Sequence, residues 1–280
     1  MNNIQGRSTA AKVAGYAVMA LVLLIIGLPL FWVVITSLKP DNQVYVQPPI
    51  WWPNPISTEA YPQVLSNVPF LRYFTNSLVI TGLLSVIKIT LGVLAAYAFV
   101  FLRFPGRSIL FMTVLAALMV PNQITVISNY ALVAQLGWIN TFQGIIIPLA
   151  GVAFGTFLMR NHFLTLPYEI IEAARIDGCG HLKLLFRVVL PMSWPTLVAF
   201  ALITVVNEWN EYLWPFLIAS DDKVAPLQVG LARLVNTDGG YTDWPMVMAA
   251  TVLTITPILV VFLILQRHMI KGLTSGAVKG

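Results

Sequence analysis

Residues 74–102 of the chain read FTNSLVITGLLSVIKITLGVLAAYAFVFL, and Lys88 is the one charged side chain in this stretch. A helix needs about 20 mostly apolar residues to cross the roughly 30 Å of hydrocarbon in a bilayer. The stretch exceeds that minimum length. It therefore predicts a membrane-spanning helix, and the flanking sequence repeats the same pattern.

Five further apolar segments pass the same length test. The six predicted spans are residues 14–38, 74–102, 108–133, 142–161, 195–219 and 244–265. The first run is too long for a secretory signal, so we expect it to be retained. No stretch between the spans is long and apolar enough to form a second domain. The sequence predicts an all-α, polytopic membrane protein in which residues 1–280 form a single transmembrane domain.

The composition is that of a chain whose main solvent is lipid. Hydrophobic residues make up 58% of the sequence and charged residues 10%, whereas soluble domains carry about 25% charged residues. The net charge of +5 does not indicate a nucleic-acid binder, because the Lys and Arg residues are scattered between apolar runs. The one cysteine, Cys179, excludes an internal disulfide and a thiolate metal site, and we expect it to be a small packing residue.

Lys and Arg residues are distributed unevenly between alternate loops, which predicts the orientation of the spans. One side of the membrane receives eleven, namely Arg7, Lys12, Arg103, Arg107, Arg160, Arg175, Lys183, Arg187, Arg267, Lys271 and Lys279. The other side receives four, namely Lys39, Arg72, Lys223 and Arg233. The side richer in positive charge is expected to be cytoplasmic, so both termini are predicted inside.

Two loops are predicted on the outer side. Residues 39–72 contain seven prolines and the pair Trp51 and Trp52, which predicts an ordered, extended cap and no helix, with aromatic rings at the membrane interface. Residues 220–243 hold four aspartates against two cations. Each loop is either a solvated surface or a docking surface for an extracytoplasmic partner.

The longest predicted cytoplasmic loop, residues 162–194, contains LPYEIIEAARIDG at residues 166–178 and VVLP at residues 188–191. Pro167 suits the first turn of a helix, Glu169 complements the positive end of the helix dipole, and Gly178 is placed to end the helix. A second helix is predicted from about residue 180 to residue 189, ending before Pro191. The loop is therefore predicted to be a helix-turn-helix on the inner membrane face.

The spacing of residues in this loop resembles a known motif. The run EAA at residues 172–174 is followed after three residues by Gly178 and, after a further nine residues, by the run VVLP at residues 188–191. This arrangement resembles the EAA coupling motif of ATP-binding-cassette importer permeases, with Val188 in place of the usual isoleucine. The resemblance implies that the loop docks into a separate ATPase subunit. The residues it assigns to coupling are Glu169, Glu172, Ala173, Ala174, Arg175, Asp177, Gly178, Leu190 and Pro191.

The same resemblance implies a larger assembly in the bacterial inner membrane. A second, homologous permease would complete the pore, two ATPase subunits would bind ATP and Mg inside, and a solute-binding protein would deliver cargo outside. This chain has no Gly-rich phosphate loop that ends in Gly-Lys-Ser or Gly-Lys-Thr. We therefore expect it to be a transport subunit without catalytic residues or a bound cofactor.

Three further stretches bear on the cargo. The tail QRHMIKGLTSGAVKG at residues 266–280 resembles the ending of carbohydrate-type permeases, the group that includes maltose, trehalose and glycerol-3-phosphate importers. LMVPNQ at residues 118–123 and WNEYLWP at residues 209–215 are most similar to the second permease of glycerol-3-phosphate or glycerophosphodiester importers. The expected cargo is one of these two phosphate compounds, and the alternative is a disaccharide or oligosaccharide such as trehalose or maltose.

Ionisable side chains inside a span cost several kcal/mol and usually face a cavity or each other. Three such residues are present, namely Lys88, Glu208 and Glu211. Asn207, Asn210, Glu211 and Trp214 follow helical spacing, so they are predicted to share one helix face. Pro215 would leave the Glu211 carbonyl without its helical hydrogen bond. A polar face beside a broken helix is typical of a substrate path.

We interpret this face as part of the translocation path, and the alternative is that the polar groups only hold helices together. The candidates for the path are Lys88, Asn122, Asn207, Glu208, Trp209, Asn210, Glu211, Tyr212 and Trp214. A phosphate on the cargo would meet Lys88, whereas a quaternary ammonium would suit the aromatic rings. Gln123 and Asn129, like Asn122, fit interhelical hydrogen bonding better, and Gly151 and Gly155 form a small-residue pair that suits packing against a partner permease.

Two other classes of function are compatible with parts of the sequence. An ion-coupled secondary transporter would use Lys88, Glu208 and Glu211 as a proton relay, but it would leave the pattern of residues 172–191 without a role. A membrane enzyme would need a nucleophile or a metal cluster. His162, His181 and His268 lack the spacing of metal ligands, so no metal site is predicted.

Overall fold

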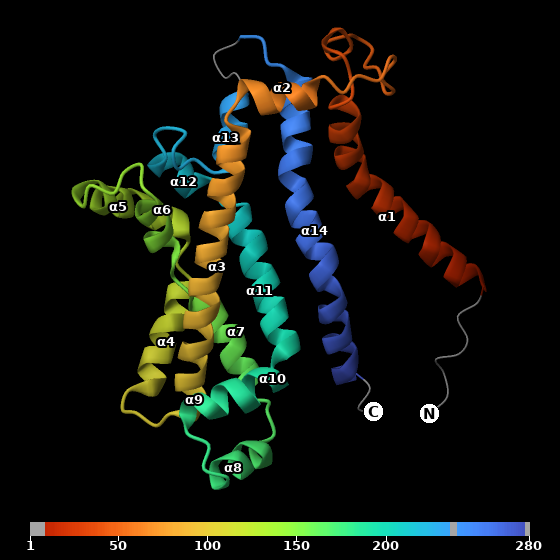
Figure 1. The fold of residues 1–280 in the computed structure, drawn as a ribbon. Helices are drawn as coiled ribbons and strands as arrows, with labels where there is room; N and C mark the ends of the chain where they lie inside the picture. The colour runs from red at the N-terminus through yellow and green to blue at the C-terminus, as the bar shows by residue number, and fades with distance from the viewer. Residues whose placement is uncertain (1–8, 236–239, 278–280) are drawn as a thin grey trace. The chain divides into compact units, whose positions relative to one another are not determined.

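The computed structural model describes residues 9–235 and 240–277, and every regular element in these ranges is a helix (Figure 1). The elements are α1 (Thr9–Thr36), η1 (Asp41–Gln43), α2 (Ala60–Asn67), α3 (Phe70–Phe101), α4 (Arg107–Leu118), α5 (Asn122–Gln135), α6 (Phe142–Leu149), α7 (Ala153–Phe163), α8 (Tyr168–Ile176), α9 (His181–Leu184), the π-helical turn η2 (Leu185–Val189), α10 (Leu190–Met192), α11 (Trp194–Trp209), α12 (Leu213–Ile218), α13 (Leu227–Leu234) and α14 (Trp244–Ala277). The predicted all-α class is confirmed.

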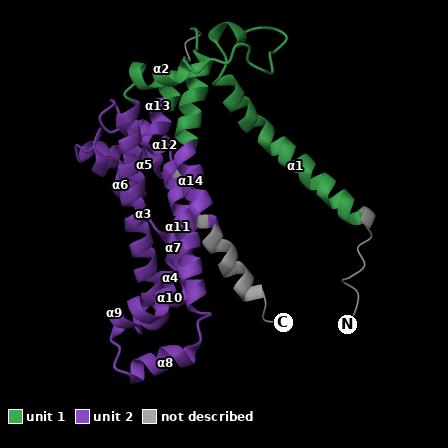
Figure 2. Ribbon diagram, turned by 45° about the vertical axis from the view of Figure 1, so that its right-hand side comes forward, with its two compact units in different colours: residues 1–69, 231–255 green, residues 70–230, 256–280 purple. Residues whose placement is uncertain are grey.

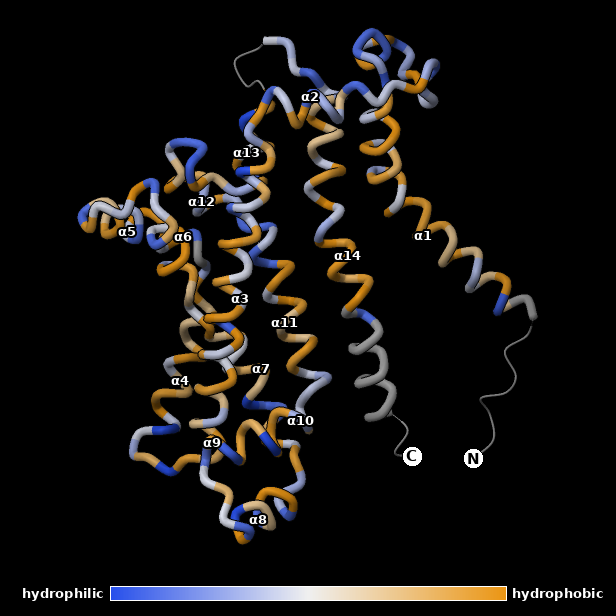
Figure 3. Tube along the Cα trace, viewed as in Figure 1, coloured by the Kyte–Doolittle hydropathy of each residue, from blue (hydrophilic) through white to orange (hydrophobic). Residues whose placement is uncertain are grey.

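Within the described ranges, three helices are long and apolar enough to cross a membrane without a break. They are Ala11–Thr36 of α1, the whole of α3, and Trp244–Ile264 of α14. Figure 3 shows hydrophobic residues along α1 and α14. Large apolar side chains on these helices are exposed in the chain alone, as at Leu24 (70%) and Val86 (64%), which is expected of surfaces that contact lipid.

The other three predicted spans are not single straight helices. The stretches Arg107–Leu118 and Gln123–Gln135 meet at 100°, α6 and α7 meet at 42°, and His181–Met192 meets Trp194–Ile218 at 85°. The span predicted over residues 108–133 stays a prediction, and in this structure it is bent. Pro121 explains this break, because it precedes α5 with φ −62° and ψ 130° and has no N–H to continue α4.

The chain groups into two compact units, which Figure 2 shows in different colours. Unit 1 comprises Met1–Pro69 and Leu231–Ile255, and unit 2 comprises Phe70–Gly230 and Thr256–Gly280. Unit 2 contains both the pattern of residues 172–191 and the intramembrane charges. The single transmembrane domain expected over residues 1–280 stays a prediction.

In unit 1, hydrogen bonds fold the segment that follows α1. The Ser57 N–H donates to the Leu38 carbonyl at 2.9 Å, and the hydroxyls of Ser37 and Tyr61 are 2.9 Å apart. The segment is ordered, as predicted, but it is not extended throughout, because residues 39–72 include η1 and α2. Pro62 is compatible with α2 because it is the third residue of that helix, where the N–H has no helical partner in any case.

A buried cluster forms the centre of unit 2 and joins α3, α7, α8, α9, η2 and α11. Its members are Val93, Ala96, Tyr97, Met159, Phe163, Ile171, Leu184, Leu185, Val189 and Phe200, which we call the central cluster. Cys179 is half-buried and packs against the edge of this cluster, in agreement with the packing role expected for it.

Gly155 of α7 allows α11 to approach closely. A Cβ atom on Gly155 would lie 2.0 Å from Cζ of Phe200, and Phe200 is only 2% exposed. Gly155 therefore packs against Phe200 of the same chain. The expectation that the pair Gly151 and Gly155 packs against a partner permease is wrong for Gly155. A Cβ atom added to Gly151 would meet no atom within 4 Å.

We predict that Gly155→Ala lowers the free energy of unfolding by about 1–3 kcal/mol, the usual cost of overpacking a filled core. The measurement is thermal unfolding of the purified protein. Gly151→Ala is the matched control, and it should leave the transition in place because a methyl group there meets nothing. Equal transitions for the two variants would contradict the close approach of Phe200.

Candidate functional site

The elbow segment, residues 167–193, begins with α8 and turns at Gly178. Pro167 precedes α8 with φ −58° and ψ 120°, Glu169 lies in the first turn, and Arg175 lies in the last. Each charge therefore lies at the end of the helix dipole that stabilises it, the acid at the positive N-terminal end and the base at the negative C-terminal end. Gly178 has φ +78°, in the left-handed region that costs a residue with a Cβ roughly 1–2 kcal/mol.

Two backbone hydrogen bonds close the turn at Gly178. The Gly178 N–H donates to the Arg175 carbonyl at 3.0 Å, and the Cys179 N–H donates to the Ala174 carbonyl at 3.0 Å. This pair of bonds is the Schellman motif, which satisfies the last carbonyl groups of a helix. Gly178 therefore ends α8, and the chain continues into α9.

The chain after the elbow stays helical for longer than predicted. α9 continues through the π-helical turn η2 into α10, and Pro191 lies within this run. The prediction that the helix ends before Pro191 is wrong. Pro191 fits because it lies in the first turn of α10, where its missing N–H is tolerated, and the wide turn η2 precedes it. The run ends at Ser193, whose hydroxyl donates to the Val189 carbonyl at 2.7 Å.

The elbow segment is anchored along one face and exposed along the other. Ile171 of α8 is 2% exposed and belongs to the central cluster, and Ala174 and Leu190 are half-buried against it. The other residues assigned to coupling are exposed, namely Glu169, Glu172, Ala173, Arg175, Asp177, Gly178 and Pro191. Tyr168 and Ile176 are also exposed, at 62% and 82%. The outer face of α8 thus combines small, acidic and apolar groups that this chain leaves uncovered.

Two polar contacts tie the elbow segment to the end of α3. The Tyr97 hydroxyl lies 3.0 Å from Nδ1 of His181, and Nη2 of Arg175 donates to the Phe101 carbonyl at 3.4 Å. Tyr97 and His181 were not expected to form a pair. No signal in the sequence joins them, because 84 residues separate them.

α3 and α11 are linked inside the membrane by an ion pair. The Lys88 ammonium lies 2.5 Å from Oε1 of Glu208, and the two side chains are 16% and 8% exposed. Hydrocarbon cannot solvate either charge, so each side chain stabilises the other. Of the three ionisable groups predicted at membrane depth, the structure brings these two together.

The polar stretch around Glu211 lies at a break between helices. α11 ends at Trp209 and α12 begins at Leu213, so the predicted continuous helix across residues 207–214 is wrong. Asn210 closes α11, because its backbone N–H and its side-chain Nδ2 both donate to the Val206 carbonyl, at 3.2 and 2.8 Å. Asn207, Asn210, Glu211 and Trp214 consequently do not share one helix face.

Glu211 and Trp214 instead stabilise the start of α12. Oε1 of Glu211 accepts a hydrogen bond from the Trp214 N–H at 3.3 Å, and Nε1 of Trp214 donates to the Gly144 carbonyl of α6 at 3.1 Å. Pro215 is the third residue of α12, so the absence of its N–H breaks no helical bond. The break begins before Pro215.

The remaining path candidates divide by exposure. Trp209 is 4% exposed, and its ring lies 6.3 Å from that of Phe74. Asn207 and Tyr212 are exposed. The side chain of Asn122 lies outside the described part of the chain. Asn129, on α5, is half-buried and its Nδ2 donates to Oγ1 of Thr125 at 3.5 Å, which is a bond within one helix and not between helices.

The segment of unit 1 that follows α1 carries a small acidic group. Burial raises the pKa of Asp41, and the nearby charges of Asp243 and Glu59 raise it further. The Tyr45 hydroxyl donates to the Thr242 carbonyl at 2.8 Å, so the two parts of unit 1 meet here. Among the described residues, no three His, Cys, Asp or Glu side chains are grouped in a way that could hold a metal ion.

Comparison with known proteins identifies similar chains. The family model described as "Binding-protein-dependent transport system inner membrane component" matches residues 88–275. The sn-glycerol-3-phosphate transport system permease protein UgpE of Yersinia pestis (bv. Antiqua, strain Antiqua) is 37% identical over 266 residues, covering 91% of this chain and 94% of that protein. The UgpE of Brucella suis is 32% identical, covering 95% and 96%.

Two solved structures share the fold. A chain of a bacterial ABC transporter involved in the import of the acidic polysaccharide alginate has a TM-score of 0.81 and 25% identity, covering 94% of this chain and 98% of that chain. A chain of a bacterial alginate ABC transporter in complex with alginate pentasaccharide-bound periplasmic protein has a TM-score of 0.66 and 14% identity, covering 89% and 92%.

We predict that Gly178→Ala weakens the end of α8, at a cost of roughly 1–2 kcal/mol for a left-handed alanine. Amide hydrogen exchange should become faster at positions 178 and 179, whose N–H groups close the turn. Gly180→Ala is the control, because Gly180 has φ −64° and open space around it. Unchanged exchange in Gly178→Ala would contradict the Schellman turn.

We predict that Lys88→Met and Glu208→Met each destabilise the protein by about 3–5 kcal/mol, because each leaves a buried charge without its partner. The double variant should regain most of that loss, since methionines can fill the same space. Thermal unfolding of the two single variants and the double variant measures the coupling. Additive losses would show that the two side chains do not depend on each other.

Proposed function

This chain belongs to the family of binding-protein-dependent transport system inner membrane components, and from that premise we propose that its cargo is sn-glycerol-3-phosphate. Family membership makes it a permease subunit of an ATP-binding-cassette importer, located in the inner membrane and not itself a catalytic subunit. The observation that carries the cargo proposal is the identity with glycerol-3-phosphate permeases over nearly the whole chain. An ion-coupled secondary transporter or a membrane enzyme does not fit this family.

A second candidate cargo has its own support. The alginate importer with the closely similar fold takes an acidic polysaccharide, so the scaffold is compatible with a saccharide substrate. A disaccharide or oligosaccharide is therefore the second candidate. A glycerophosphodiester is a variant of the first candidate, because it contains glycerol-3-phosphate. The fold alone does not select among them, since one fold supports many substrates.

We propose six spans, formed by α1, α3, α14 and the three bent pairs. The bends of 100°, 42° and 85° are compatible with broken spans or re-entrant segments, which transporters use where the backbone lines a cavity. The distribution of Lys and Arg supports both termini, and the elbow segment, on the cytoplasmic side.

We propose that the exposed face of α8 docks into a groove of a partner ATPase. A short amphipathic helix with small residues at its centre suits such a groove, and the acids at its rim can form ion pairs. The ATPase pair would bind ATP with Mg, a second homologous permease would complete the pore, and an extracytoplasmic binding protein would deliver the cargo. This chain supplies the mechanical connection, because the opposite face of α8 is part of the central cluster.

The path residues take two different roles in this proposal. Lys88 and Glu208 neutralise each other and link α3 to α11. In this proposal the ion pair breaks and re-forms when the two helices shift relative to each other. Asn207 and Tyr212 are exposed beside the break between α11 and α12, so they suit the lining of the path. A phosphate cargo would still meet Lys88 in a state where the pair opens.

The function is tested by reconstituting this chain with its second permease, ATPases and binding protein in liposomes. We predict uptake of radiolabelled glycerol-3-phosphate that requires ATP hydrolysis and persists when an ionophore collapses the proton gradient. Excess unlabelled trehalose or maltose should not compete. Stronger competition by glycerophosphocholine than by unlabelled glycerol-3-phosphate would favour the diester as the cargo. Uptake of a sugar without uptake of glycerol-3-phosphate would overturn the cargo proposal.

We predict that Ala173→Arg lowers uptake about tenfold or more, because a long charged side chain replaces a methyl group at the centre of the docking face. Less ATPase should also co-purify with the variant. Ser66→Arg, an equal change of charge on the exposed helix α2, is the control for co-purification and should leave the amount of bound ATPase unchanged. Normal co-purification of Ala173→Arg would show that α8 is not the docking face.

A further inference from the structure

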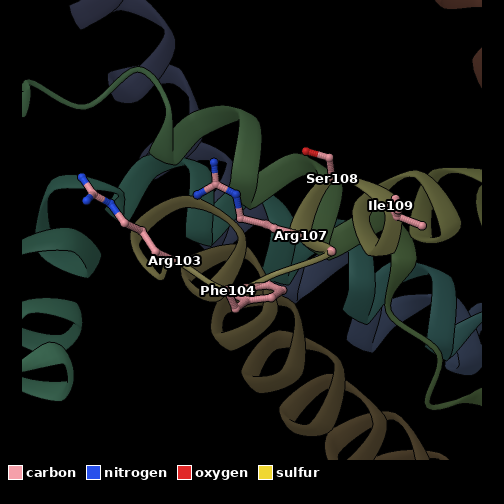
Figure 4. A pocket seen from close by; sticks show the side chains of 6 residues that line it. Arg103, Phe104, Arg107, Ser108 and Ile109 are labelled. Carbon is pink, nitrogen blue, oxygen red and sulfur yellow. The ribbon is translucent and has the colours of Figure 1, made fainter.

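The turn between α3 and α4 forms the wall of an open surface cavity that the transport function leaves unassigned. Its volume is about 520 Å³, and it is lined by Arg103, Phe104, Gly106, Arg107, Ser108 and Ile109. Figure 4 shows the side chains of Arg103 and Arg107 extending toward the same side of the turn, with Phe104 below them. The cavity opens where one candidate span ends and the next begins, which is a position near a membrane surface.

The cavity carries positive charge that this chain does not neutralise. Among the described residues, neither Arg103 nor Arg107 is in an ion pair, in contrast to Lys88 and Lys223. Arg107 is held in place by bonds from Nη1 to the Val100 and Leu102 carbonyls, at 3.5 and 3.3 Å, which leaves its other N–H groups available. Guanidinium groups bind phosphate oxygens through paired N–H donors, so the site suits a phosphate anion.

Arg160 adds to the positive field around the cavity. It lies close enough to Arg107 for their like charges to repel, and its guanidinium lies 3.8 Å from the centre of the Phe111 ring. A bound anion would relieve this repulsion. The hydroxyl of Ser108, which lines the same cavity, adds a neutral donor.

The apolar part of the cavity continues onto a surface that faces lipid. Ile109 is 73% exposed, and Leu110 and Met112 of the same helix are 52% and 65% exposed. A ligand with a phosphate group and hydrocarbon chains would cover both the arginines and this strip. A free phosphate ester would leave Phe104 and Ile109 uncovered.

We propose that this cavity binds the phosphate group of an anionic phospholipid, whose acyl chains lie along the start of α4. Basic pockets between transmembrane helices are a recurring form of lipid headgroup site. The site bears on the elbow segment, because Arg107 and Arg175 donate to neighbouring carbonyls at the same end of α3. A bound lipid would therefore fix the α3–α4 turn beside the elbow segment.

The test is native mass spectrometry of the assembled importer, titrated with phosphatidylglycerol and, separately, with phosphatidylcholine. We expect one phosphatidylglycerol per copy of this chain to bind more tightly than phosphatidylcholine. In the double variant Arg103→Gln, Arg107→Gln, that binding should weaken about tenfold or more, because two charge-assisted contacts are lost. The lysine variant, Arg103→Lys with Arg107→Lys, keeps the charge but loses the paired N–H donors, so its affinity should lie between those of the wild type and the glutamine variant.

The matched control is Arg72→Gln with Lys223→Gln, which removes the same charge at exposed positions away from the cavity and should leave the lipid bound. Three results would overturn the proposal: unchanged binding in the Arg103→Gln, Arg107→Gln variant, equal loss in the control, or equal affinity for phosphatidylcholine. Displacement by free glycerol-3-phosphate would assign the site to a soluble phosphate ester and would also overturn it. The titration uses no cargo transport, so it is independent of the outcome of the uptake assay.

Discussion

Burial of Ile171, Leu184, Leu185 and Val189 makes the elbow segment part of the same packed body as α3, α7 and α11. Each of these side chains is 2% exposed or less. Emptying such a position costs about 2–5 kcal/mol for a large aliphatic residue, so the segment is not free to swing by itself. A force on the exposed face of α8 must therefore displace the helices that pack on its other face. Local flexibility is limited to the turn, and there the positive φ of Gly178 and two backbone hydrogen bonds fix the geometry.

α3 connects the parts of unit 2 that matter for transport. Its last turns contact the elbow segment through Tyr97 and the Phe101 carbonyl, and its middle carries Lys88, which pairs with Glu208 of α11. The phospholipid site proposed at Arg103 and Arg107 lies directly after the same helix. A displacement of α3 would strain the ion pair with α11, whose own end lies beside the break at residues 210–212. The contacts with the elbow segment at the end of α3 and the ion pair in its middle are thus joined through one continuous helix.

Local signals in the sequence predicted the features that depend on local physics. The apolar runs predicted helices. Gly178 was predicted to end a helix because glycine readily adopts the left-handed backbone conformation that a helix end requires. Features that depend on distant partners were not predictable: Lys88 and Glu208 are 120 residues apart, and Gly155 is small because Phe200 packs on it. The helix breaks were predictable only in part. Pro121 is a visible cause of the first, but the break before α12 precedes Pro215 and is stabilised by Asn210 and Glu211, whose side chains bond to nearby backbone.

The central claim is that α8 and α3 move together as one body when the partner ATPases bind ATP. It is tested most directly by a spin-label distance between Ile170→Cys on α8, an exposed residue that is not assigned to coupling, and Val86→Cys on α3, in a Cys179→Ser background that retains uptake. The distance should be the same in the nucleotide-free and ATP-bound importer. A change as large as one helical turn, about 5 Å, would show that the elbow segment moves independently of α3 and would contradict the claim.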